Sequence, residues 1–183
     1  MKKVLFLFGE LSDPDIDWLI AHGKKTSVAQ GTVLIHKGEQ IDALFIVLEG
    51  LLDVSVPGHD KLISRLGAGE IVGELSFVDS RTPSTTVRAA TDSVVYSVAR
   101  EVLSARLQEE AEFAARFYRA LSIFLAHRMR RLTLQMSAGP ASSSERPSSD
   151  ELNEEVLDGV YLAGSRFQRM LKGVSSGPSN VRP

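Results

Sequence analysis

The 183-residue sequence contains no cysteine. This absence excludes disulfide bonds, thiolate metal sites and cysteine nucleophiles, and it is compatible with a reducing compartment, so we expect a cytoplasmic protein. No apolar run approaches the roughly 20 residues that span a bilayer, so we expect no transmembrane segment. The net charge is -2 at pH 7, which gives the chain no overall attraction to nucleic acid or to an anionic membrane.

The motifs of common catalytic and metal sites are also missing. The four histidines lie far apart in the sequence and show neither HxH nor HExxH spacing: His22, His36, His59 and His127. His36 falls in an expected strand, where a barrel could present a metal ligand, but no second ligand completes the set. A GxSxG elbow and a Walker loop are absent as well. We therefore expect neither an enzyme nor a metal site.

Short runs rich in Val, Ile, Leu and Thr, broken by glycines, fill residues 26–98. They recur about every ten residues, a spacing typical of antiparallel strands joined by turns. The clearest runs are TVLIH, ALFIVLEG, LLDVSV, KLISRLG and SVVYSV. Parallel α/β units would need helices between the strands, so the pattern predicts a small antiparallel barrel or jelly roll.

Helical patterns stand on both sides of these runs. Ser12 followed by Asp13 and Pro14 is typical of a helix start, and Gly23 of its end. Residues 100–136 contain neither Pro nor Gly and predict one long helix.

The long helix has two apolar faces. One is a heptad-like stripe: Leu107, Ala111, Ala114, Tyr118, Leu121, Leu125, and, after a slip near Arg128, Met129, Leu132 and Met136. The neighbouring face carries Phe113, Phe117, Ala120 and Phe124. Since one barrel can cover only one of these faces, we expect a homodimer through the helix 100–136. The basic run Arg128 to Arg131 is interpreted as complementing the dipole at the end of this helix.

Beyond the long helix the composition changes. Residues 137–150 are rich in Ser, Pro and Gly and predict a flexible linker. Residues 151–173 predict a short amphipathic helix, whose two internal glycines cost about 1 kcal/mol each, so its segment 151–171 needs a surface of this chain or of an unknown protein partner. Residues 174–183 are expected to be a disordered tail.

The stretch GELSFVDSRTPSTTV, residues 73–87, carries the chemistry. Gly73 supplies the freedom for a tight turn into a short helix, whose free N–H groups form an anion cradle. Glu74 in such a cradle suits a sugar hydroxyl beside the anion, because a carboxylate accepts hydrogen bonds. The alternative is an ordinary connection between strands with an exposed Glu74.

Three segments in order resemble the cyclic nucleotide-binding domain family: GTVLIHKGEQIDALFIVLEG (31–50), RLGAGEIVGELSFVDS (65–80) and TTVRAATDSVVYSV (85–98). The resemblance implies a mainly β fold with α, a double-stranded β-helix or jelly-roll-like β-roll. An N-terminal helix and the long C-terminal helix would flank it within a domain of residues 1–136.

The resemblance also implies site residues. Gly73, Glu74 and Leu75 match the family pattern, with Glu74 on the ribose, and Ser84 matches the small residue after the phosphate-binding Arg. The Arg position itself falls on Pro83, which has neither a side-chain donor nor an N–H. This loss should weaken phosphate binding by about one to four orders of magnitude.

Other groups are expected to supplement the cradle. Backbone amides around Gly73 to Ser76 and Ser84 to Thr85 would hold the phosphate, and Gln135 would cap the base. Arg81 is either a replacement for the lost guanidinium or a solvated loop residue, and the second interpretation is favoured.

The function predicted from this resemblance is a stand-alone sensor or regulatory module for cAMP or cGMP. Related transcription factors carry a winged helix of some 60 to 80 residues after the long helix, whereas 47 residues follow Met136 here, so we do not expect DNA binding. The alternative is a ligand-free dimeric scaffold that docks a partner through its C-terminal helix. Pro83 favours the scaffold, and the intact Gly73-Glu74-Leu75 favours the sensor.

Overall fold

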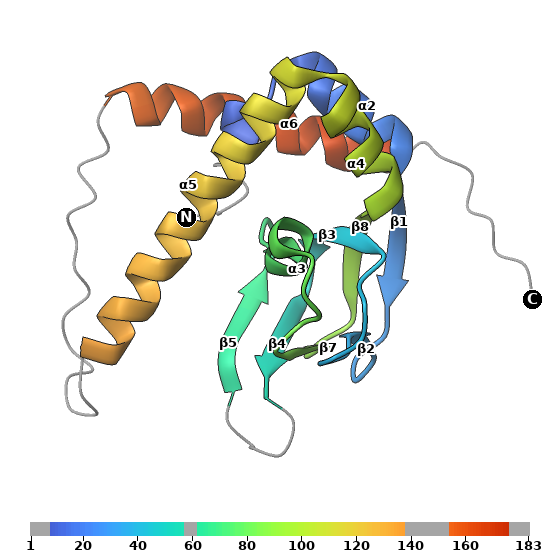
Figure 1. Cartoon of the computed structure of the whole chain (residues 1–183), viewed down its shortest axis with the longest axis vertical. Helices are drawn as coiled ribbons and strands as arrows, with labels where there is room; N and C mark the ends of the chain where they lie inside the picture. The colour runs from blue at the N-terminus through green and yellow to red at the C-terminus, as the bar shows by residue number, and fades with distance from the viewer. Residues whose placement is uncertain (1–7, 57–61, 138–153, 176–183) are drawn as a thin grey trace, which may run out of the picture.

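The computed structural model describes residues 8–56, 62–137 and 154–175. Two four-stranded antiparallel sheets form a β-roll, and the helices α2, α4 and α6 gather at one end of it (Figure 1). The first sheet has the order β1 (Gly23–Val28), β8 (Ser93–Ala99), β3 (Ala43–Glu49) and β6 (Ile71–Val72). The second has the order β2 (Val33–Ile35), β7 (Thr86–Ala89), β4 (Leu51–Ser55) and β5 (Leu62–Gly67). The predicted fold class is confirmed.

Strand β3 is buried on both faces. Leu44, Ile46 and Leu48 pack in the core shared with the helices, whereas Val47 packs in the core between the two sheets. This double burial explains why β3 is a continuous apolar run rather than an alternating one.

Helix α2 (Asp13–His22) begins where the sequence predicts. The Ser12 backbone N–H donates to Asp15 Oδ2 at 2.8 Å, and the Asp15 N–H donates to Ser12 Oγ at 3.4 Å, which completes a capping box. At its other end the buried Tyr96 hydroxyl donates to the Leu19 carbonyl at 2.9 Å. Gly23 follows because a Cβ there would meet the Tyr96 ring at 2.2 Å.

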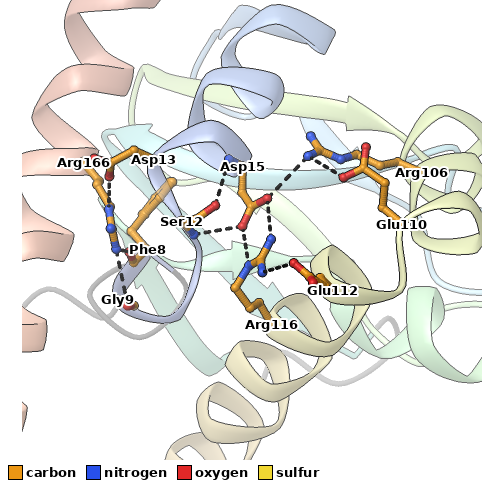
Figure 2. Close-up of polar contacts among 10 residues, drawn as sticks. All are labelled: Phe8, Gly9, Ser12, Asp13, Asp15, Arg106, Glu110, Glu112, Arg116 and Arg166. Carbon is orange, nitrogen blue, oxygen red and sulfur yellow. Dashed lines mark hydrogen bonds and ion pairs between the residues drawn. The ribbon is translucent and has the colours of Figure 1, made fainter.

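The prediction of one helix over 100–136 is wrong. The chain forms α4 (Arg100–Glu109) and α5 (Ala111–Ser137), and Glu110 between them is extended, with φ -118° and ψ 92°. No local breaker causes this change of direction. Instead, Phe113 and Phe117 at the start of α5 are fully buried in the helical core, while Asp15 of α2 binds an arginine from each side of the break (Figure 2).

Helix α6 (Glu154–Ser175) packs on α2 of its own chain, and its Ala163, Phe167 and Met170 are buried. The Arg166 guanidinium donates to Asp13 Oδ1 at 2.6 Å and to the Phe8 carbonyl at 2.9 Å. The predicted amphipathic helix is therefore present, and it covers α2. The predicted linker 137–150 beyond Ser137, and the predicted tail 174–183 beyond Ser175, lie outside the described residues.

None of the helices within the described ranges combines the length and apolar character needed to cross a membrane.

Candidate functional site

The turn predicted at Gly73 leads directly from β6 into α3 (Glu74–Asp79). Gly73 has φ 92°, a left-handed conformation that favours glycine, and its carbonyl accepts from the Phe77 N–H at 3.0 Å. The sequence forms this turn because glycine adopts the left-handed conformation without strain, and α3 then starts with the buried Glu74. Glu74 is only 2% exposed, so the alternative of an exposed Glu74 in a plain connection is wrong.

A cavity of about 300 Å³ opens beside α3, at the lower end of the size range of ligand pockets. Aliphatic side chains line it: Ile35, Ile41, Val54, Leu66, Val72 and Val87. The predicted residues that also line it are Gly73, Glu74, Leu75, Ser76, Arg81, Pro83, Ser84 and Thr85. The structure thus brings all but one of the predicted site residues to one cavity, while their roles stay predictions.

Gln135 is the exception. It belongs to α5, but the structure describes only its place in the helix, so the predicted base-capping role is untested.

Arg128 of α5 also lines the cavity, and its Nη1 donates to Glu74 Oε1 in an ion pair. Burial raises the pKa of the Glu74 carboxyl above its ordinary value of 4.5, and the charge of Arg128 opposes this rise without cancelling it. Sequence reasoning missed this residue because it assigned the basic run to the helix dipole. The slip of the apolar stripe near Arg128 was the available signal.

The loop that follows α3 shows how Pro83 and Arg81 lie. The Pro83 carbonyl accepts from the Gly38 N–H at 2.9 Å, which ties this loop to the loop after β2. The Arg81 side chain is 85% exposed, with its Nε 4.0 Å from Asp79 Oδ2. The Arg81 side chain therefore lies beside Asp79 and is open to solvent. Arg128, in contrast, forms its ion pair with Glu74 in the lining of the cavity.

Arg100 connects α3 to the helices. It is the first residue of α4, and its guanidinium donates to the Ser76 carbonyl at 2.8 Å and to Ser80 Oγ at 3.1 Å. These bonds satisfy groups at the end of α3. Arg100 thereby links the end of α3 to the start of α4, a contact that no local pattern indicates.

His36 lies just after β2, outside the strand in which it was expected, and it is exposed. Among the described residues, no group of three His, Asp or Glu side chains is placed to hold a metal ion.

Residues of both sheets, of α3 and of α5 thus line one cavity of a β-roll. Residues 25–110 match the family model described as cyclic nucleotide-binding domain. The chain thus contains a domain of the cyclic nucleotide-binding family, as the resemblance indicates.

Three known proteins illustrate this relationship. The chain is 32% identical over 109 residues to a cyclic nucleotide-gated potassium channel of Rhizobium etli, covering 58% of this chain and 30% of the channel. It is 26% identical over 122 residues to the cAMP-activated global transcriptional regulator CRP of Escherichia coli, covering 64% of this chain and 56% of the regulator. The chain therefore spans about half or less of these relatives.

A solved cyclic nucleotide-binding domain from Methylobacillus flagellatus shares the fold. It superposes with a TM-score of 0.66 at 20% identity, over 78% of this chain and 84% of that one.

Proposed function

We propose that the protein is a cytoplasmic regulatory sensor that binds cAMP or cGMP beside α3 and shifts α5 in response. The Glu74–Arg128 ion pair carries this proposal. It joins Glu74, the residue expected on the ribose, to α5, so a ligand that contacts Glu74 competes with or rearranges this contact between α3 and α5. The cytoplasmic location accords with the cysteine-free sequence.

The chemistry of the cavity accords with a nucleotide. The carboxyl group of Glu74 accepts hydrogen bonds from ribose hydroxyls, the aliphatic wall suits a purine, and backbone amides at Ser76, Ser84 and Thr85 suit a phosphate. Pro83 supplies no donor, so we expect weak binding. The names of the two curated relatives, a cAMP-activated regulator and a cyclic nucleotide-gated channel, support the ligand class.

We further propose that α5 forms a homodimer. Its outward face exposes Tyr118 by 47% and Met129 by 71%, which leaves two large apolar side chains for a second copy to cover. A shift of α5 would then change the arrangement of the two subunits.

The scaffold alternative has less support. It requires the C-terminal helix to present an apolar face to a partner, whereas Phe167 and Met170 are buried against α2 in the same chain.

Calorimetry of the purified chain with cAMP and cGMP tests the ligand, and Pro83→Arg sharpens the test. A guanidinium at position 83 should tighten nucleotide binding roughly 10- to 100-fold, because a charge-assisted bond is regained. Arg81→Ala is the matched control and should change affinity little, since its side chain is 85% exposed and lies beside Asp79. Absence of binding by both the natural chain and Pro83→Arg at millimolar nucleotide would overturn the proposal.

A further inference from the structure

We propose that the cavity takes up a proton together with its anionic nucleotide: Glu74 becomes a neutral carboxylic acid and releases Arg128 to the phosphate. This inference rests on the proposed function and specifies how a pocket without an arginine at position 83 accommodates a negative charge.

The charges that line the cavity balance before a ligand binds. The charged side chains in the described lining are Glu74, Asp79, Arg81 and Arg128. Asp79 and Arg81 form their own exposed pair, with side-chain exposures of 47% and 85%. Away from this exposed pair, the positive charge of Arg128 is already neutralised by its ion pair with the ionised Glu74.

A cyclic nucleotide phosphate adds one negative charge to this balanced interior. Taking an uncompensated charge out of water costs several kcal/mol, and Pro83 offers no cation to offset it. One guanidinium cannot neutralise both Glu74 and the phosphate. The missing positive charge must come from elsewhere, and a proton from solvent is the smallest carrier that fits.

Glu74 is the group placed to accept that proton. Burial and the charge of Glu70, from the turn before β6, raise its pKa, and Arg128 from α5 is the charged side chain that opposes them. When Arg128 turns to the phosphate, this opposition is lost. His36 and Lys37, on the loop tied to Pro83, are exposed and outside the cavity lining.

The exchange balances without any covalent step. A solvent proton binds one carboxylate oxygen of Glu74, and the guanidinium of Arg128 exchanges that oxygen for a phosphate oxygen. The resulting O–H of Glu74 can donate to a ligand oxygen, so the carboxyl group keeps a hydrogen-bond partner. The interior is neutral before and after binding.

Coupling of this kind makes affinity depend on pH with a definite sign. Wherever Glu74 is ionised in the free protein and protonated in the complex, the dissociation constant should fall up to about tenfold for each pH unit of acidification. Below the pKa of Glu74 in the free protein, the dependence should level off.

Calorimetry with cAMP from about pH 6 to 8, in buffers of low and high ionisation enthalpy, measures the protons taken up. We expect uptake approaching one proton per nucleotide in the natural chain. Glu74→Gln should bind cAMP with no uptake and a flat pH profile. Adenosine, which lacks the phosphate, leaves Arg128 on Glu74 and should be taken up without a proton. Binding of cAMP by the natural chain without proton uptake would overturn the inference while leaving the proposed function intact.

Pro83→Arg gives a second test that does not alter Glu74. Its added guanidinium supplies the missing charge, so proton uptake should fall sharply as affinity rises. Undiminished uptake in this variant would count against the inference. If neither the natural chain nor Pro83→Arg binds cAMP at any pH in the range, the proposed function itself fails.

Discussion

Two buried carboxylates, Asp15 and Glu74, are each paired with an arginine of α5, yet their environments drive their pKa values in opposite directions. Asp15 is 1% exposed and Glu74 is 2% exposed. Burial raises the pKa of Asp15, but hydrogen bonds from Arg116 and Ser12 outweigh it, so the net pKa is lowered. For Glu74, burial prevails over Arg128 and the net pKa is raised.

The number of donors explains the difference. Asp15 receives bonds from Arg116 Nε at 2.7 Å, Ser12 N–H at 2.8 Å and Arg106 Nη2 at 3.4 Å (Figure 2). In the described part of the chain, the side-chain partner of the Glu74 carboxylate is Arg128, and Glu74 also bonds to its own backbone. Three donors from other residues tie the Asp15 carboxylate to the fold, whereas Glu74 has one ion-pair partner that a ligand could replace.

Arg106 shows how completely the Asp15 cluster is built into the core. Its guanidinium carbon lies over the rings of Trp18 and Phe113, 4.5 and 4.2 Å from their centroids. Its Nε and Nη1 are buried without a hydrogen-bond partner in the described part of the chain. The two rings, Asp15 and Glu110 therefore stabilise the charge of Arg106.

Replacing Asp15 should have the largest effect. Asp15→Ala removes the buried partner of both arginines and leaves Arg106 with only the half-exposed Glu110, so the free energy of unfolding should fall by about 3 kcal/mol. Glu74→Gln should cost less than about 1.5 kcal/mol, because Arg128 can turn toward the partly open cavity. Urea unfolding at neutral pH measures both. Equal losses in the two variants would refute the contrast between a structural and an exchangeable carboxylate.

The pH dependence of stability should separate the same two residues. With its lowered pKa, Asp15 contributes stability above the unfolded value of about 3.9, and that contribution is lost as pH falls through its folded pKa. With its raised pKa, Glu74 imposes no penalty below about 4.5, and the penalty grows as pH rises through its folded pKa. In a plot of urea midpoint against pH, Asp15→Asn should therefore flatten the fall in stability below about pH 3.9. Glu74→Gln should flatten the change that occurs above about pH 4.5. The assignment is wrong if both variants change the same limb.

The two carboxylates also show what sequence can predict. Local signals were sufficient for the helix start at Ser12, for the glycine-broken strands and for the turn at Gly73, because each depends on a few neighbouring residues. Glu74 was predicted as a site residue through its motif, and the structure places it in the cavity lining.

Contacts distant in sequence were not predictable in this way. The partners of Asp15 are 91 and 101 residues away, and Arg128 is 54 residues from Glu74. The break at Glu110 follows from packing of Phe113 and Phe117 rather than from a local breaker. The start of strand β1 was not predicted, because its four central residues are exposed and give no apolar pattern. The strand forms by antiparallel pairing with β8.

Removing the cap of α2 should have an intermediate effect. In Ser12→Ala the Asp15 N–H loses its acceptor, while the bond from the Ser12 backbone N–H to Asp15 remains, so we expect a loss of about 1 kcal/mol. Ser12→Asn restores an acceptor and is the matched control. Thermal unfolding of the two variants measures the difference, and a loss as large as that of Asp15→Ala would mean that the cap and the arginine cluster form one unit.

The smallest effect is expected from an exposed ion pair on the same helix. Asp17 accepts from Arg169 of α6 at 2.9 Å, but both side chains are about half exposed. Water screens such a pair and ordering its side chains costs entropy, so Arg169→Ala should lower the free energy of unfolding by less than about 0.5 kcal/mol. Amide hydrogen exchange of α6 should stay nearly unchanged, since Phe167 and Met170 hold the helix by burial. Loss of protection along α6 in this variant would show that charge, rather than apolar contact, holds α6 on α2. The contribution of each α2 carboxylate to the free energy of unfolding would then depend on its ion-pair partner rather than on the burial of its side chain.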